Sequence, residues 1–230
     1  MTNRIVCFDL ETTGFDYARG ERVIEIGAVE IVDGKITDNT FHQYINPDGK
    51  IISTDSYMVH KLSNAFLADK PKFADVAQSL LDFIGDSTVV AHNGIDFDFP
   101  FINAELTRCG LPTIPPEQQV DSIVVARHKV FGPKTYTLDS LAKFFGVSLV
   151  ARADAHGALI DADILARVYL EIMASETTES ITEVMEKQHA AFLAVPRPGA
   201  DFPHRTFAPS ESEITTHTEF IDKNVKNSIW

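Results

Sequence analysis

The segment Ile5-Val-Cys-Phe-Asp-Leu-Glu-Thr-Thr-Gly14 sets the architecture of this chain, because an apolar run passes directly into two acidic residues and a polar turn. Its first part, Arg4–Phe8, has the character of a buried strand. Asp9 and Glu11 follow two positions apart, so in a continuing strand both carboxylates face the same side. Thr12-Thr13-Gly14 forms a tight turn whose backbone N–H groups can face a phosphate or a base. A solvated strand end with two ordinary acids is the alternative, and the polar turn favours a site.

Two later segments also place acidic residues beside apolar runs. Asp98 lies in Val90-Ala-His-Asn-Gly-Ile-Asp-Phe-Asp-Phe-Pro100, and Asp161 lies in His156-Gly-Ala-Leu-Ile-Asp-Ala162. A carboxylate in such surroundings is costly to bury unless a positive charge neutralises it, and none of the three segments contains Lys or Arg. A bound cation is the natural neutraliser, and oxygen-only ligands favour a hard ion, Mg²⁺ or Mn²⁺. The predicted metal ligands are Asp9, Glu11, Asp98 and Asp161.

Asp98 is preferred to Asp96 because it lies at the start of a predicted helix. It is followed closely by Pro100, and proline is favoured in the first helical turn. Asp96 fits an ordinary acid in a surface turn. The N-terminus of this helix would help to attract phosphate. His92, earlier in the same segment, is predicted to be a structural histidine.

Two histidines are candidates for a functional role. His156 lies five residues before Asp161, in the loop before the helix that carries this Asp. Because histidine has a pKa near neutrality, His156 is predicted to be a general base for a water beside the metal, with a lone surface histidine as the alternative. His60 closes Asp55-Ser-Tyr-Met-Val-His60 and fits a terminal-phosphate contact or a structural role equally well. The acidic set with a hard cation and a base predicts a metal-dependent nuclease.

Three strand patterns are followed by alternating helices and strands. Asp33-Gly34 predicts a hairpin turn between the second and third strands. This order predicts an α/β fold with a mixed central sheet and helices on both faces. Pro47–Lys61 is predicted to be an irregular loop with a short helical turn. Strands are expected over residues 4–8, 23–32, 36–45, 88–91 and 120–122, and helices over 73–84, 99–108, 122–130, 137–145 and 158–173.

Composition changes near residue 174, so we predict a domain over residues 1–173 and a flexible linker with a docking tail over residues 174–230. Glu176–Ser180 is polar and Val195–Gly199 is rich in helix breakers, whereas apolar positions return before Trp230. No apolar stretch approaches the roughly 20 residues that span a bilayer. The N-terminus lacks an export signal, and two cysteines make no disulfide framework, which favours the cytoplasm.

The net charge of −13 restricts how such a nuclease could hold its substrate. Proteins that grip duplex DNA broadly carry a basic footprint, because affinity comes largely from neutralising phosphates. Divalent ions would reverse the sign of the charge locally at the site. A strand terminus needs no broad basic face, and a processive partner could supply the remaining affinity through effective concentration.

At its acidic residues the chain resembles the DEDDh family of 3′→5′ exonucleases. The family pattern is Asp-x-Glu, a central Asp and His-x4-Asp, and residues 4–173 supply all three parts in order. The resemblance is strongest to the epsilon (proofreading) subunits of bacterial DNA polymerase III. The segments that carry it are residues 8–14, 23–28 and 156–162, with Ser212-Glu-Ile, Thr218–Asp222 and Ser228–Trp230 in the tail.

One segment is instead similar to the TREX-type exonucleases. Between His92 and Asp98 there is one residue more than is usual in epsilon subunits. Asp121-Ser122 and the stretch Tyr136–Leu138 share this similarity.

The resemblance implies an RNase H-like fold and hydrolysis with two ions of Mg²⁺ or Mn²⁺ per site. It implies that Asp9 bridges both ions, that the other three acids complete their coordination shells, and that His156 deprotonates the attacking water. The product is then a nucleoside 5′-monophosphate. The expected partners are a single-stranded or frayed DNA 3′ end, the alpha subunit of DNA polymerase III through the tail, and a sliding clamp. The expected substrate contacts are Asp9, Leu10, Glu11, Thr12, Thr13, Asp55, His60 and Asp161.

Two other functions compete with a proofreading subunit. A free-standing DNA or RNA exonuclease of the RNase T or TREX type would share the acidic set, but it has no need of a tail ending in Ile-Trp230. A catalytically dead adaptor on the same fold would be expected to lack part of the acidic set. The set here is complete, so the proofreading subunit is the leading hypothesis.

Overall fold

The computed structural model describes residues 3–152 and 157–175. All of them belong to one compact unit. The predicted linker and tail beyond residue 175 lie outside the described residues, and the boundary near residue 174 stays a prediction.

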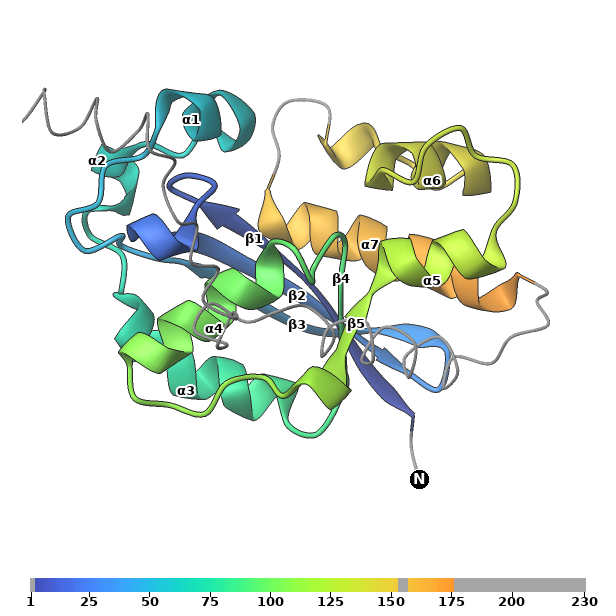
Figure 1. Cartoon of the computed structure of the whole chain (residues 1–230), viewed down its shortest axis with the longest axis horizontal. Coiled ribbons are helices and arrows are strands. Elements are labelled where there is room, and N and C mark those ends of the chain that lie inside the picture. Colours follow the sequence, from blue (N-terminus) through green and yellow to red (C-terminus); the bar gives the residue numbers. More distant parts are fainter. Residues whose placement is uncertain (1–2, 153–156, 176–230) are drawn as a thin grey trace, which may run out of the picture. The chain divides into compact units, whose positions relative to one another are not determined.

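A five-stranded mixed sheet forms the centre of the domain, in the order β3-β2-β1-β4-β5 (Figure 1). The first three strands pair antiparallel, and β4 and β5 run parallel to β1, so the predicted fold class is confirmed. Asp33 and Gly34 have φ of 49° and 76° and form the predicted hairpin turn. The strands are β1 (Arg4–Thr12), β2 (Val23–Val32), β3 (Lys35–Tyr44), β4 (Thr88–Ala91) and β5 (Gln119–Asp121).

The first strand is longer than the apolar run predicted. Residues 9–12 continue β1 because they pair with β2, from Asp9 opposite Gly27 to Thr12 opposite Val23 across an irregularity in the register. Asp9 and Glu11 therefore alternate with Leu10 along a true strand, as their shared face requires.

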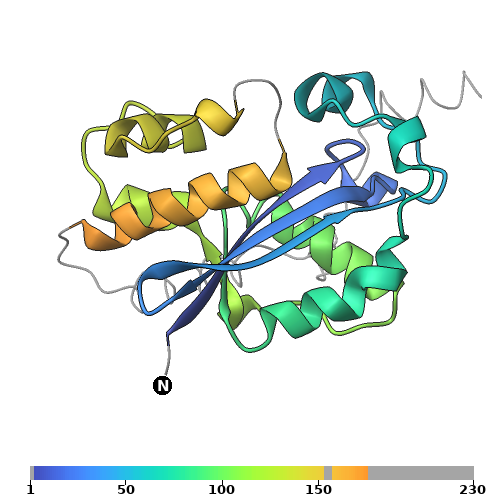
Figure 2. The same ribbon diagram turned by 180° about the vertical axis from the view of Figure 1, so that it is seen from behind.

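Helices cover both faces of the sheet (Figures 1 and 2). Val6, Phe8 and Leu10 pack into one core cluster with α3 (Phe73–Ile84) and α4 (Asp98–Arg108). Cys7, on the opposite face of β1, packs into a second cluster. The helices of that second cluster are α5 (Ser122–Lys129), α6 (Leu138–Phe145) and α7 (Ala158–Ala174).

Short helices fill the connections. The predicted loop over residues 47–61 contains α1 (Thr54–His60), which Ser53 caps through a hydrogen bond from the Ser56 amide. The helix α2 (Asn64–Leu67) was not predicted, because four residues are too few to show a helical period. The 3-10 turns are η1 (Tyr17–Arg19), η2 (Pro116–Gln118) and η3 (Val150–Arg152). Among the described residues, no helix has the length and apolar character needed to cross a membrane.

The start of α7 approaches β2 so closely that only glycine fits at the crossing. A Cβ on Gly27 would lie 2.1 Å from the Leu159 backbone nitrogen and 2.2 Å from the Ala158 carbonyl carbon. Because Gly27 pairs with Asp9 in the sheet, this crossing brings the first turn of α7 beside Asp9. The backbone contact thus sets the distance between two of the predicted ligands.

Candidate metal and active site

Three of the four predicted metal ligands come together at the end of β1. Asp9 and Glu11 lie on the sheet face that α7 covers, and Asp161 lies in the first turn of α7. One ligand atom from each of the three lies within 4.8 Å of the other two. Glu11 and Asp161 are 9% and 3% exposed, so these carboxylates are held out of bulk water.

Asp98 lies beside this group as the first residue of α4. It is 3% exposed, and its negative charge is the largest contribution after burial to the raised pKa of Asp9. The Leu10 backbone lowers the pKa of Asp98 by hydrogen bonding, which ties α4 to β1. Asp96 is exposed, so burial separates the two candidate acids in the way the helix argument predicted.

Burial and mutual repulsion raise the pKa values of these acids above their ordinary values. Burial is the largest cause in each case, and it raises the pKa of Glu11 and of Asp98 to about 8. The pKa of Asp9 is raised by burial and then by the charges of Asp98, Glu11 and Asp161. A divalent cation would offset this repulsion and favour the ionised forms. The donor set consists of carboxylate oxygens, so these residues fit a hard divalent ion.

A positive charge that the sequence patterns did not predict lies at the site. Arg152, in η3, places its Nε 2.8 Å from Oδ1 of Asp161, and it also contacts Asp139 on α6. Its charge lowers the pKa of Asp9 and of Glu11, against the larger effect of burial. Arg152 stands outside the three acidic segments, so their composition does not reveal it. The only hint in the sequence was that Arg152 lies four residues before His156, the predicted base.

A fifth buried acid was also missed. Glu25 pairs with Glu11 in the sheet register, is 2% exposed, and is the largest contribution after burial to the raised pKa of Glu11. His42 Nε2 lies 2.7 Å from Glu25 Oε1, which supplies a partner for this carboxylate. The available signal was strand pairing, because residues directly opposite each other on neighbouring strands share a face of the sheet.

The two histidines of the acidic segments differ in what the structure describes. His156 lies outside the described residues, and Gly157, the next residue, precedes the first turn of α7. The role of His156 as general base therefore stays a prediction. His92 has the structural role expected of it, with Nδ1 2.9 Å from Ser122 Oγ and its pKa lowered to about 4, chiefly by burial.

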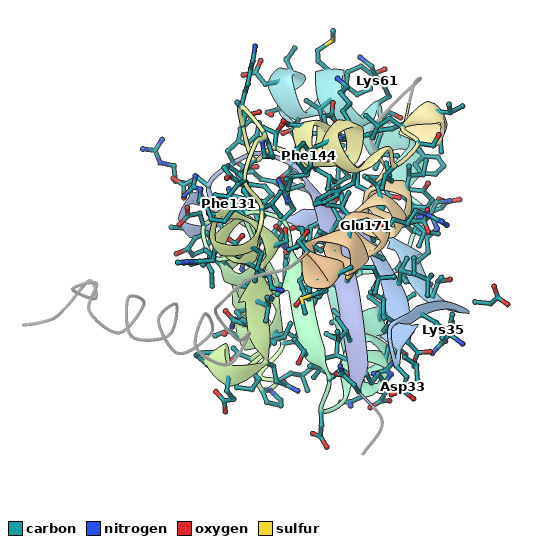
Figure 3. The ribbon with its side chains drawn as sticks, turned by 90° about the vertical axis from the view of Figure 1, so that its right-hand side faces the viewer. Asp33, Lys35, Lys61, Phe131, Phe144 and Glu171 are labelled. Carbon is teal, nitrogen blue, oxygen red and sulfur yellow. The ribbon has the colours of Figure 1, made fainter. Side chains whose placement is uncertain are left out.

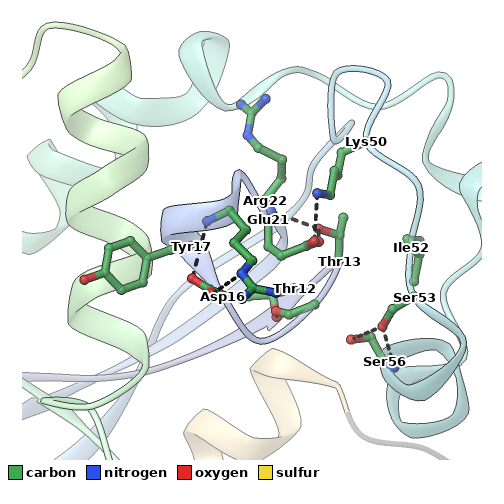
Figure 4. A network of polar contacts seen from close by, with 12 residues as sticks. Thr12, Thr13, Asp16, Tyr17, Glu21, Arg22, Lys50, Ile52, Ser53 and Ser56 are labelled. Atoms are coloured by element: carbon green, nitrogen blue, oxygen red, sulfur yellow. Dashed lines mark hydrogen bonds and ion pairs between the residues drawn. The ribbon is translucent and has the colours of Figure 1, made fainter. Parts of the chain in front are cut away.

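The polar turn after β1 is joined to the segment before α1 (Figure 4). Thr13 Oγ1 donates to Glu21 at 2.6 Å, and Lys50 Nζ lies 2.7 Å from the same carboxylate. The Ser53 amide donates to the Thr13 carbonyl at 2.8 Å. Thr12 donates to the Gly14 carbonyl at 2.7 Å. Both threonine hydroxyls are thus used inside the protein, so their backbones and methyl groups are left as candidate substrate contacts.

The remaining predicted substrate contacts divide into buried and exposed groups. Leu10 is 4% exposed, and His60, the last residue of α1, is 3% exposed. His60 Nδ1 accepts a hydrogen bond from the Leu62 amide at 3.0 Å, which places the ring proton on Nε2, and burial lowers the pKa of His60. Asp55 is exposed in the first turn of α1, and its contact with a substrate stays a prediction.

Comparisons with known proteins give one consistent family. The model of the exonuclease (RNase T) family matches residues 6–169. The chain is 36% identical to the DNA polymerase III subunit epsilon of Rickettsia conorii over 231 residues, covering 98% of each chain. It is 34% identical to the subunit of the same name from Escherichia coli over 241 residues, covering 99% of this chain and 97% of that one.

Solved structures show the same fold. Exonuclease X in complex with 5′ overhanging duplex DNA is 28% identical, with a TM-score of 0.57, and covers 79% of this chain and 98% of its own. The nuclease domain of 3′hExo, a DEDDh family member bound to rAMP, is 16% identical, with a TM-score of 0.64. It covers 78% of this chain and 98% of its own, and at this identity it shows the fold alone.

Proposed function

This chain belongs to the exonuclease family and, within it, to the family of the DNA polymerase III epsilon subunit, and we propose that it is the proofreading 3′→5′ exonuclease of a bacterial replicative polymerase. It removes nucleoside 5′-monophosphates from DNA 3′ ends in the cytoplasm. The observation that carries the proposal is the meeting of Asp9, Glu11 and Asp161 within 4.8 Å, with Asp98 buried beside them.

The family implies divalent metal ions, and we propose two ions of Mg²⁺ or Mn²⁺ held by Asp9, Glu11, Asp98 and Asp161. Bound divalent ions supply an activated water at neutral pH and stabilise charge on the leaving 3′ oxygen. The protein contributes a largely buried site, since three of these four acids are less than 10% exposed. The raised pKa values of Glu11 and Asp98 are consistent with acids that require a cation to ionise.

Other side chains position the substrate and move a proton. His156 accepts the proton of the attacking water, a role that requires a pKa near neutrality and reach to the water. The terminal nucleotide lies against Leu10 and the turn at Thr12 and Thr13, with His60 and Asp55 at the 3′ end. The hydrogen bonds from Thr13 to Glu21 and from Ser53 to Thr13 support this by holding the turn and α1 together.

A substitution at His156 tests the assignment of the base. His156→Ala is expected to reduce the rate of hydrolysis by roughly 10²-fold or more, the typical contribution of a general base, while Mn²⁺ binding measured by calorimetry stays nearly unchanged. Unchanged turnover would refute the role of His156. Loss of metal binding would show instead that the substitution disturbs the site.

The polymerase alpha subunit is the proposed partner of the tail, with a sliding clamp as a further family-level partner. Full-length protein and residues 1–175 should be compared for co-purification with a bacterial polymerase alpha subunit and for digestion of single-stranded DNA in Mg²⁺. Loss of binding with retained digestion is the expected result. Digestion without any polymerase binding by the full chain would favour a free-standing exonuclease of the RNase T or TREX type.

A further inference from the structure

One stretch of this acidic protein carries the opposite charge. Residues 122–152 contain one acidic residue, Asp139, and five basic ones, a net of 5 − 1 = +4, whereas the whole chain has a net charge of −13. The stretch comprises α5, the following loop, α6 and η3. Its basic residues are Arg127, Lys129, Lys134, Lys143 and Arg152.

Three of these cations face solvent. Lys129 is buried and donates to the Met173 and Ser175 carbonyls, and Arg152 contacts Asp161, as described above. Arg127, Lys134 and Lys143 are exposed, and among residues 3–152 and 157–175 none of them forms an ion pair with a carboxylate. These three charges are therefore available to an anionic ligand.

Exposed aromatic rings accompany the cations. Phe131 is 81% exposed and Phe144 is 47% exposed, and Figure 3 shows both on this side of the molecule. A Cβ on Gly132 would lie 3.2 Å from the Phe144 ring, so the backbone next to Phe131 lies close to that ring. The two aromatic side chains thus belong to one patch. We name Arg127, Phe131, Lys134, Lys143 and Phe144 the α5–α6 surface.

The loop that presents Phe131 and Lys134 is anchored at both ends. Tyr136 Oη donates to the Val130 carbonyl at 2.9 Å, and the Arg127 guanidinium lies 6.0 Å from the centre of the Tyr136 ring. An anchored loop loses little conformational entropy when it binds a ligand.

Two other residues of the same stretch connect the α5–α6 surface to the acidic site. The Tyr136 backbone raises the pKa of His92, which places the loop beside the segment leading to Asp98. At the other end of the stretch, Arg152 lies 2.8 Å from Asp161. A polymer whose end occupies the acidic site can therefore continue onto the α5–α6 surface.

We propose that the α5–α6 surface binds the single strand on the 5′ side of the nucleotide in the active site. The exposed cations contact phosphates, and the rings of Phe131 and Phe144 stack on bases, which is the combination that proteins use to bind single strands without sequence preference. The charge favours a nucleic acid because a cationic patch on a protein of net charge −13 attracts polyanions locally. The proposal rests on the proposed exonuclease function.

Two substrates separate this surface from the active site. Thymidine 5′-p-nitrophenyl phosphate occupies only the site, whereas a 12-nucleotide single strand also reaches the surface. In the full chain, Phe131→Ala with Phe144→Ala is expected to raise KM for the 12-mer about fivefold or more per ring, with turnover of the ester unchanged. Lys134→Glu with Lys143→Glu is expected to raise KM for the 12-mer and to flatten its salt dependence by about 0.7 for each phosphate that is no longer neutralised. Lys35→Glu, an exposed charge reversal at the start of β3 and away from both rings in Figure 3, is the control and is expected to leave the kinetics of both substrates unchanged.

The outcomes distinguish the possible errors. An unchanged KM for the 12-mer in both double variants would overturn the proposal, as would equal losses on the ester, which would show damage to the site. If the variants kept their DNA kinetics but no longer co-purified with the polymerase, the surface would bind a protein partner. That result would also overturn the proposal. Failure of the unaltered chain to hydrolyse either substrate would refute the proposed exonuclease function instead.

Discussion

Replacing Gly27 by alanine should separate Asp161 from Asp9 without touching any charged group. The added Cβ would lie 2.1 Å from the Leu159 nitrogen and 2.2 Å from the Ala158 carbonyl carbon. Ordinary contacts between heavy atoms begin near 3.5 Å, so β2 and the start of α7 must move apart by about 1.4 Å. Both obstructing atoms belong to the backbone, so no change of side-chain rotamer relieves the overlap.

The structural change has consequences for stability and for the site. Overpacking of this kind costs about 1–3 kcal/mol of unfolding free energy, which urea denaturation measures. A displacement of about 1 Å at a reacting group can reduce the rate roughly 10²-fold. We therefore expect Gly27→Ala to lower kcat/KM by at least that factor and to weaken Mn²⁺ binding measured by calorimetry.

Gly157→Ala is the control for this experiment. Its Cβ would lie 3.8 Å from Ile160 Cδ1, an ordinary contact, and the expected cost is at most about 1 kcal/mol, the scale of an N-cap change. If Gly27→Ala retained both the unfolding free energy and the metal affinity of the unaltered chain, the close backbone approach would not be what positions Asp161.

Three further predictions concern the buried charges. Because the pKa of Glu11 rises from its ordinary 4.5 to about 8 on folding, the folded state binds protons more tightly, so metal-free stability should fall as pH rises from about 4.5 to about 8. In chelator-treated samples, Glu11→Gln should make the melting temperature fall less steeply as the pH rises. An equally steep fall in the variant and in the unaltered chain would contradict this prediction. Mn²⁺ binding at pH 7 should release protons, detected as a calorimetric heat that depends on the buffer; a heat independent of the buffer would argue that the acids are already ionised. Glu105 is fully buried and accepts hydrogen bonds from Arg22 at 2.7 and 3.0 Å, so Glu105→Ala should cost about 3–5 kcal/mol in urea denaturation. Asp163→Ala, which breaks the more exposed pair with Arg167, should cost less than about 1 kcal/mol, and equal losses for the two variants would refute the burial argument.

Local patterns predicted the regular elements well because their rules act over a few residues. The strand over residues 23–32 follows from a mostly apolar run, and the turn at Asp33 and Gly34 follows from residues that tolerate a positive φ. The end of β1 was placed too early, at Phe8. Its continuation to Thr12 depends on pairing with β2, which no pattern within β1 contains.

Some residues of the site were predicted from the sequence and others were missed. The shared face of Asp9 and Glu11 follows from strand parity alone. Glu25 was missed because its position opposite Glu11 depends on the register between two strands. Arg152 was missed because it lies outside the three acidic segments, and it reaches Asp161 only after η3 and α7 pack together.

The amino-acid sequence by itself determined the chemistry available: carboxylates for a hard cation, a histidine before the last of them, and the strand and helix that carry them. Only the tertiary structure decided which groups meet. The crossing at Gly27 places Asp161 against Asp9, and the start of α4 places Asp98 beside Asp9. The physical reason is that secondary structure responds to neighbours along the chain, whereas burial and strand register join segments that are distant in it. The raised pKa values of the acids arise from that burial, so they too are properties of the fold.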